Sequence, residues 1–213
     1  MVKWDSMYSK VESLWGTAPK DTLVQYIDLI PKEGKILDLG IGEGRNALFL
    51  ASKGFIVDGV DISKTAVERC LKNAKEANLD INAEVGDLME YKIEQNSYSL
   101  IILSNVLNFL RDDEIGIIIN KVRDGLKNNG LIYIDAFDVN DPMIERYQKK
   151  FEEVSKNTFY RPKLDTYIHF FTKEELEQIF INYKKIKESQ MYFLDTEHGE
   201  AHYHSCIEML DQK

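Results

Sequence analysis

The residues best suited to cofactor chemistry form a glycine-rich run, Asp38-Leu39-Gly40-Ile41-Gly42-Glu43-Gly44, at the end of a short apolar stretch. Glycine lets the chain turn sharply and lets a ligand approach main-chain atoms without a Cβ in the way. Residues 45–51 then read as a helix, whose N-terminus presents free N–H groups and a partial positive charge. Asp61 follows Gly42 by nineteen residues, where a carboxylate can accept hydrogen bonds from ribose hydroxyls. The pattern predicts a nucleotide-cofactor site.

Two cofactors fit the glycine turn. Its second part, Gly42-Glu43-Gly44-Arg45-Asn46-Ala47, matches the dinucleotide pattern G-x-G-x-x-G/A, which indicates NAD. The turn nevertheless begins at Gly40, and Asp38 precedes it inside the strand. Arg45 also stands where a dinucleotide turn from Gly40 would need a third small residue. The longer string D-x-G-x-G-x-G resembles motif I of the class I S-adenosylmethionine (SAM) methyltransferases.

Further polar residues follow the later apolar runs of the chain. Asp87 follows the third run, where a carboxylate can bind an adenine amine, and Ser104-Asn105 follows the fourth. Ligands of parallel α/β sheets bind at these carboxyl ends of strands. The order of strand-end residues resembles motifs I to IV of SAM methyltransferases and favours SAM over NAD. We expect the cofactor site to contain Asp38, Gly40, Gly42, Gly44, Arg45, Asp61, Ile62, Asp87, Leu88 and Ser104, with Tyr8 and Trp15 as candidates for a cation–π contact with the sulfonium.

Several of these assignments have structural alternatives. Asp38 either binds the cofactor or only caps the glycine turn. Arg45 either contacts the methionyl carboxylate of SAM or pairs with Glu43. Tyr8 and Trp15 either touch the cofactor or pack in a core or lid. The two cysteines, Cys70 and Cys206, are expected to be structural.

The elements that must position these residues alternate between strand and helix. Apolar runs predict strands at 35–39, 55–60, 81–85, 98–103, 131–134, 186–194 and 201–210. Helical spacing predicts helices at 2–15, 23–30, 45–51, 66–77 and 112–126, the last ended by Asn128-Asn129-Gly130. This order predicts an α/β fold, a doubly wound and mostly parallel seven-stranded sheet with helices on both faces and an antiparallel C-terminal strand pair. We expect one domain over 1–213, with 1–31 covering the cofactor site and 140–170 as a candidate substrate lid.

Composition and charge restrict the class of substrate. The chain has 213 residues, 44% hydrophobic and 30% charged, and a formal net charge of −9. Such a surface repels phosphate backbones and anionic membranes. No apolar run approaches the ~18–20 residues of a membrane span, and the first residues do not resemble a signal peptide. We therefore expect a cytoplasmic protein with a small-molecule substrate and no nucleic-acid or membrane partner, and leave its oligomeric state open.

One methyltransferase family resembles this chain in more detail. Residues 37–55, with their Gly-Arg-Asn turn, and residues 102–110 and 171–176 are similar to the tellurite-resistance methyltransferases. The resemblance implies SAM as methyl donor and S-adenosylhomocysteine as product. Members of that family carry histidine and arginine facing the oxyanion in the C-terminal segment, whereas residues 198–205 here contain no arginine. A neutral or softer nucleophile is therefore as plausible an acceptor as a chalcogen oxyanion.

The C-terminal histidines are candidates for the acceptor site. His202 and His204 are two residues apart, so on a strand both point to the same face. We expect them in the substrate pocket, where an imidazole can take a proton or orient the acceptor. The alternatives are an outer strand with ordinary hydrogen bonds, or a metal site with His198 as third ligand. We assign no metal, and we expect His169 to be structural or part of a lid.

The predicted reaction is in-line displacement of the SAM methyl group by a small-molecule nucleophile. The sulfonium is already a good leaving group, so alignment in a dry pocket supplies most of the acceleration. An NAD(P)-dependent oxidoreductase and a non-catalytic SAM-binding protein are the alternatives. No Tyr-x-x-x-Lys pair of the short-chain reductase kind directly follows the fourth strand, which weakens the oxidoreductase.

Overall fold

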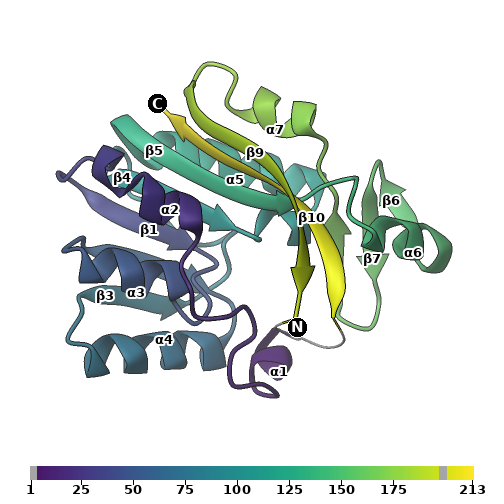
Figure 1. The fold of residues 1–213 in the computed structure, drawn as a ribbon, viewed down its shortest axis with the longest axis horizontal. Coiled ribbons are helices and arrows are strands. Elements are labelled where there is room, and N and C mark those ends of the chain that lie inside the picture. Colours follow the sequence, from purple (N-terminus) through teal and green to yellow (C-terminus); the bar gives the residue numbers. More distant parts are fainter. Residues whose placement is uncertain (1–3, 197–200) are drawn as a thin grey trace.

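The main sheet of the protein has seven strands in the order β3-β2-β1-β4-β5-β10-β9 (Figure 1). The structure, a computed structural model, describes residues 4–196 and 201–213. Neighbours from β3 to β5 pair in parallel, whereas β10 pairs antiparallel with β5 and β9. The strands are β1 Lys35–Leu39, β2 Val57–Asp61, β3 Ile81–Val85, β4 Tyr98–Ser104, β5 Leu126–Phe137, β9 Lys184–Asp195 and β10 His202–Gln212. This topology confirms the predicted fold.

Helices cover both faces of the sheet, as the sequence predicts (Figure 1). Helices α2, α3 and α4 contribute to the core on one face, and α5 and α7 to the core on the other. The helices are α1 Trp4–Tyr8, α2 Asp21–Gln25, α3 Arg45–Ser52, α4 Lys64–Glu76, α5 Asp112–Gly125, α6 Met143–Lys150 and α7 Lys173–Ile179, with 3-10 turns at Ile27–Leu29 and Leu107–Phe109. Among the described residues, none of these helices has the length and apolar character needed to cross a bilayer.

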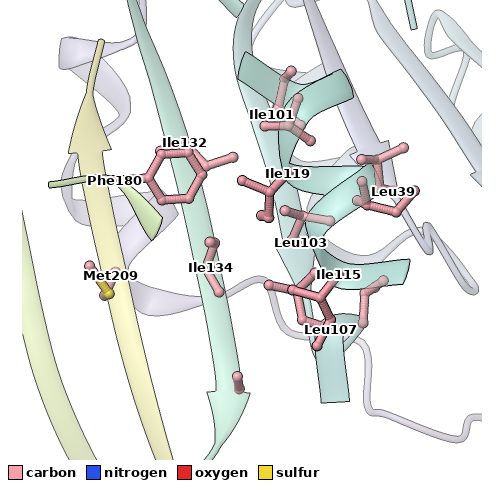
Figure 2. Close-up of a cluster of buried hydrophobic side chains, with 14 of the residues drawn as sticks. Leu39, Ile101, Leu103, Leu107, Ile115, Ile119, Ile132, Ile134, Phe180 and Met209 are labelled. Carbon is pink, nitrogen blue, oxygen red and sulfur yellow. The ribbon is translucent and has the colours of Figure 1, made fainter. Parts of the chain in front are cut away.

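Successive side chains of the central strands enter two separate hydrophobic cores. Ile101 and Leu103 of β4 pack in the core against α5, which Figure 2 shows together with Ile132 and Ile134 of β5. The alternate residues of β4, such as Ile102, belong to the core on the opposite face. Because both faces are covered, these strands need apolar residues at every position. This is why they appear in the sequence as continuous apolar runs.

The N-terminal segment differs from the predicted long helix over 2–15. Within the described residues α1 ends at Tyr8, and turns and bends follow as far as Pro19. The helical spacing instead reflects packing of this segment over α4, with Tyr8, Leu14 and Ala66 in one small core. Asp5 of α1 accepts hydrogen bonds from the Ser63 hydroxyl (2.9 Å) at the N-terminus of α4. Packing against another helix thus produced a helical pattern in a mostly irregular segment.

Two further boundaries differ from prediction. Helix α5 ends at Gly125, and Asn128-Asn129-Gly130, predicted as a loop, lie inside the long strand β5. Asn129 has a φ of +63° there, so the strand accommodates a turn-forming residue without ending. A second sheet, absent from the prediction, consists of β6 Glu153–Ser155, β7 Thr158–Arg161 and β8 Thr166–His169. Helix α7 begins with a capping box, in which Thr172 and Glu175 exchange side-chain and backbone hydrogen bonds.

A buried ion pair attaches the N-terminal segment to the main sheet. The ammonium of Lys20 lies 2.6 Å from Asp135 of β5, whose side chain is fully buried. The backbone N–H of Lys20 also donates to Asn46 of α3 at 3.0 Å. The segment before α2 is thus fixed at both its main chain and its side chain.

We expect the substitution Lys20→Met to destabilise the protein, because it leaves the Asp135 carboxylate buried without its cation. Removing one partner of a fully buried pair costs about 3–5 kcal/mol. Since the Lys20 side chain keeps 17% of its surface exposed, we expect a smaller loss of about 2 kcal/mol in the free energy of unfolding. Urea denaturation measures it, with Lys20→Arg as the charge-preserving control. Equal stability of both variants would contradict the role given to this pair.

Candidate cofactor and acceptor site

A cavity of about 270 Å³ lies where β1, β2 and β4 end at their carboxyl edge. Ligands of open α/β sheets bind at this edge. Eleven of the twelve residues expected to bind the cofactor line this cavity: Tyr8, Trp15, Asp38, Gly40, Gly42, Arg45, Asp61, Ile62, Asp87, Leu88 and Ser104. The strand ends and the N-terminal segment together bring residues as far apart in sequence as Tyr8 and Ser104, 96 positions, to one cavity.

Asp61 links the glycine turn to the end of β2. One carboxylate oxygen accepts the Gly42 N–H at 2.9 Å, and the other accepts the Ser63 N–H at 2.8 Å. Burial raises the pKa of Asp61, although these backbone N–H groups oppose the rise. Each carboxylate oxygen has a second lone pair, so Asp61 can still accept hydrogen bonds from a ligand in the cavity. Its side chain thus both holds the turn and faces the site.

Asp38 and Arg45 flank the glycine turn in the chain, and both line the cavity. Asp38 is 2% exposed, and burial raises its pKa to about 8, with Arg45 lowering it and Asp61 raising it. The Arg45 guanidinium donates to the Trp15 carbonyl at 2.8 Å and lies 3.3 Å from the Ser104 hydroxyl. Arg45 therefore fastens the N-terminal segment over the end of β4.

Glu43, the alternative partner considered for Arg45, has a different ion pair. Its carboxylate lies 2.7 Å from the Arg69 guanidinium of α4. It also accepts the Leu14 N–H at 3.0 Å. Glu43 consequently attaches the N-terminal segment to α4, and Arg45 is directed to Trp15 and Ser104.

Gly44 is the one predicted cofactor residue that does not line the cavity. It precedes α3 with a φ of +85°, and a Cβ there would lie 2.5 Å from the Cys70 sulfur. Cys70 is fully buried, and burial raises the pKa of its thiol to about 12. Gly44 and Cys70 thus provide close packing between the turn and α4, and Cys70 is structural in this geometry.

The substitution Gly44→Ala tests this packing. Gly54 offers a matched control, because its φ is +86° and a Cβ there would meet nothing within 4 Å. A left-handed backbone conformation costs an alanine roughly 1–2 kcal/mol at either position. Overpacking adds about 1–3 kcal/mol only at Gly44. We expect Gly44→Ala to lower the melting temperature more than Gly54→Ala, and the double variant Gly44→Ala, Cys70→Ala to recover part of the difference. Equal losses would exclude the contact with Cys70 as the cause.

A second part of the cavity lining comes from segments that sequence reasoning did not assign to a site. Trp4 of α1 and Phe109 form an edge-to-face aromatic pair with centroids 4.7 Å apart. Asp165 lies in the turn between β7 and β8 and accepts a hydrogen bond from the Tyr160 hydroxyl at 2.9 Å. This part of the lining contains Trp4, Val106, Phe109, Leu110, Glu114, Asp165, Thr166 and Tyr167. No periodic pattern in the sequence marks these residues, because they come from four separate elements.

Charges around the cavity are predominantly negative. Among the described residues that line it, Arg45 is the sole cationic side chain. The acidic side chains of the lining are Glu43, Asp61, Asp87, Glu114 and Asp165, together with Asp38, whose raised pKa leaves it largely protonated at neutral pH. Low-dielectric walls lined by one sign of charge concentrate ligands of the opposite sign. The cavity is therefore electrostatically suited to a cationic cofactor or acceptor.

The C-terminal histidines are placed elsewhere. Neither His202 nor His204 lines the cavity, although both were expected in the substrate pocket. They share one face of β10 as predicted, and their rings lie 4.5 Å apart. His169 is buried and lies 2.7 Å from the Thr158 hydroxyl, and burial lowers its pKa. His198 lies outside the described residues.

Comparisons with known proteins agree with this geometry. The family described as "Methyltransferase domain" matches residues 36–130. The chain is 24% identical to a carboxy-SAM synthase of Campylobacter curvus, over 73% of this chain and 65% of that protein. It is 29% identical to the probable SAM-dependent methyltransferase TehB of Haemophilus influenzae, over 48% of this chain and 35% of TehB. A human tRNA N(3)-cytidine methyltransferase, METTL2B, is 29% identical over 68% of this chain and 40% of that protein.

Solved structures show the same fold. A SAM-dependent methyltransferase from Methanosarcina mazei superposes with a TM-score of 0.74 at 20% identity, over 92% of this chain and 98% of that one. TehB from Haemophilus influenzae superposes with a TM-score of 0.72 at 22% identity, over 98% of this chain and 66% of that one. The chain spans only 65% and 35% of the first two curated relatives. Residues 36–130 thus match a methyltransferase domain, and the relatives and the fold support a class I SAM-dependent methyltransferase related to TehB, with SAM favoured over NAD as cofactor.

Proposed function

We propose that this chain transfers the methyl group of SAM to a small-molecule acceptor. One observation carries the proposal: the strand-end residues that fit SAM and the aromatic wall built by α1, η2 (Leu107–Phe109) and the β7–β8 turn line the same cavity. A donor and an acceptor held in one enclosed space can react at effective molarities of about 10⁵–10⁸ M. When bound, SAM supplies an activated methyl group on a sulfonium. The protein then has to align the acceptor and exclude water.

The residues of the cavity fit each part of SAM. Gly40 and Gly42 have positive φ angles of 74° and 55°, so the main chain at this turn can approach the ligand closely. Asp61 has lone pairs left for ribose hydroxyls, as described above. Asp87 is exposed beside the cavity and can accept a hydrogen bond from the adenine amine. Asp38 lines the same cavity, and its ionised form would stabilise the cationic end of the ligand.

Charge favours a neutral or cationic acceptor over an anion. The acceptor wall carries Glu114 and Asp165, and no lysine or histidine is found among the described residues lining the cavity. Tellurite and other oxyanions would meet carboxylates there, and a nucleic acid would also meet a chain with net charge −9. We therefore place amines and neutral aromatic compounds ahead of oxyanions and tRNA as acceptors.

Two segments are proposed to close over the bound ligands. Trp4, Tyr8 and Trp15, from the first 31 residues, line the cavity, and so do Asp165 and Tyr167 from the three-stranded sheet. Closure of such segments excludes water from the reacting atoms. Residues 1–31 would then cover the cofactor, and residues 140–170 would form a substrate lid within the same single domain. Buried, unpaired Cys70 and Cys206 are consistent with the cytoplasmic location that we propose.

The first experiment compares ligands by thermal shift. SAM and S-adenosylhomocysteine are expected to raise the melting temperature, whereas NAD is expected to leave it unchanged. Mass action stabilises a protein by about 2.7 kcal/mol at a ligand concentration 100 times the dissociation constant. Stabilisation by NAD alone would overturn the cofactor assignment.

The second experiment identifies the acceptor class. SAM with a labelled methyl group is incubated with the full chain and, separately, with a small-molecule extract fractionated by charge or with bulk tRNA. Label is expected in the cationic or neutral fraction, and Asp61→Ala is expected to abolish its transfer. Label in tRNA or in the anionic fraction would overturn the acceptor class. SAM binding without label in any fraction would favour a non-catalytic SAM-binding protein.

A further inference from the structure

The β9–β10 hairpin carries a cluster of three side chains that sequence reasoning assigned to the substrate pocket or left unassigned. His202 pairs with Asp195 across the two strands, and His204 lies two residues further along the same face. One ligand atom from each of Asp195, His202 and His204 lies within 4.8 Å of the others. The hairpin extends beyond the other strands of the main sheet, at the end of the molecule where α1 also lies (Figure 1). None of these three side chains lines the cavity, so the cluster is separate from the candidate cofactor site.

His204 is prepared for coordination by a buried carboxylate. Its Nδ1 lies 2.8 Å from an Asp141 carboxylate oxygen, and both side chains are almost fully buried. The same carboxylate accepts the Ser205 N–H at 3.0 Å and the Met143 N–H at 2.8 Å. Because Asp141 accepts from backbone N–H groups on both oxygens, it is an acceptor for His204 and fixes the proton on Nδ1.

This hydrogen bond to Asp141 also fixes the orientation of the other ring nitrogen of His204, Nε2. With the proton on Nδ1, the lone pair of a neutral His204 is on Nε2, which lies 3.9 Å from an Asp195 carboxylate oxygen. Histidine ligands of metals commonly donate their second N–H to a carboxylate in this way. Phe137 packs on the His204 ring with centroids 4.8 Å apart, which restricts its rotation. The hairpin therefore holds one histidine in the orientation and tautomer of a metal ligand.

We propose that Asp195, His202 and His204 bind a divalent first-row transition metal of the zinc class, with Asp141 as the outer carboxylate. Two imidazole nitrogens and one carboxylate oxygen are a donor set that zinc accepts, with the fourth position left for water or an added ligand. Bonds of about 2.0–2.1 Å require the donor atoms to approach to roughly 3.4 Å, so His202 and Asp195 move inward by about 1 Å on binding. Both are partly exposed and have room to do so. This site is independent of the proposed methyl transfer.

Zinc binding to the full chain tests the proposal. The protein is treated with a chelator, and Zn²⁺ is titrated against a chromophoric competitor. One Zn²⁺ per chain is expected, with at least a 10-fold loss of affinity in His202→Ala and in Asp195→Asn. Co²⁺ in place of Zn²⁺ is expected to give the visible absorption of a tetrahedral or five-coordinate N/O site, which an adventitious surface ion does not give. The outer-carboxylate variant Asp141→Asn is expected to weaken binding by about 10–100-fold.

Two controls separate this site from loss of folding and from the cofactor site. Tyr203 lies between the histidines on the opposite face and stacks on Tyr192 with centroids 5.1 Å apart. The variant Tyr203→Ala is therefore expected to keep zinc affinity while altering the same hairpin. SAM affinity is expected to stay unchanged in His202→Ala, which reports that this variant is folded. Absence of zinc binding in the wild-type chain, or equal affinity in His202→Ala and Tyr203→Ala, would overturn the proposal.

Discussion

The substitution Asp61→Ala is expected to weaken SAM binding by at least about 100-fold, or about 2.7 kcal/mol. Hydrogen bonds to a charged group contribute about 1.5–3 kcal/mol each, and a ribose offers two hydroxyls to one carboxylate. The loss has a second cause. Without Asp61 the N–H groups of Gly42 and Ser63 lose their acceptor, so the glycine turn is no longer fixed to the end of β2. Isothermal titration calorimetry measures the affinity.

The variant Asp61→Asn tests the two backbone hydrogen bonds that Asp61 accepts in the structure. Asparagine keeps the shape of the side chain but replaces one acceptor oxygen by an NH₂ donor. In either orientation that donor faces a backbone N–H, of Gly42 or of Ser63. We therefore expect Asn to cost nearly as much affinity as Ala. Asp87→Ala is expected to cost less affinity, because Asp87 is exposed and its carboxylate accepts the Met89 N–H of its own turn, so its loss leaves the glycine turn in place. Undiminished SAM binding by Asp61→Ala would remove Asp61 from the cofactor site.

The position of Asp61 could be predicted from the sequence, whereas the positions of the lining residues Trp4, Phe109 and Asp165 could not. Strand ends of a parallel sheet meet at one edge, so a carboxylate nineteen residues after Gly42 is positioned by topology alone. No comparable topological rule predicts that Trp4, Phe109 and Asp165 line the cavity. Asp165 depends on a three-stranded sheet whose strands have three or four residues each, too short for a period-2 pattern to be recognised. The positions of these lining residues are therefore set by tertiary packing and not by a local sequence pattern.

For His202 and His204, too, only part of the arrangement could be predicted from the sequence. Spacing in the sequence correctly places His202 and His204 on one face of a strand. It does not say which side of the sheet that face covers, since the answer depends on the pairing of β9 with β10 and on the twist of the hairpin. The structure turns this face toward Asp141 and Asp195, and the cavity is lined by other elements. The alternation of side chains along a strand thus predicts that the two histidines share a face, whereas the residues that this face contacts depend on the tertiary fold.

Asp38 is expected to make both stability and SAM binding depend on pH between about pH 4 and 8. Burial raises its pKa from 3.8 to about 8 in the folded chain, so between these values the folded state binds a proton that the unfolded state has released. The contribution of Asp38 to stability is therefore complete below pH 4 and is lost as the pH rises toward 8. At about 1.4 kcal/mol per pKa unit, the loss is several kcal/mol. We expect Asp38→Asn to be more stable than the wild type in alkaline urea denaturation, and similar to it at acid pH.

Ligand binding should reverse the protonation of Asp38. A cation in the cavity favours the charged carboxylate, so SAM binding at pH 7 is expected to release up to one proton from Asp38 and to strengthen as the pH approaches 8. Calorimetry in two buffers of different ionisation enthalpy measures that proton. Asp38→Asn is expected to bind SAM more weakly and without the Asp38-linked proton release, because its amide neither ionises nor attracts the cation. Proton release that is the same in both proteins would assign the titration to another group. Asp38 would then be a carboxyl group that supports the glycine turn without contacting the cofactor.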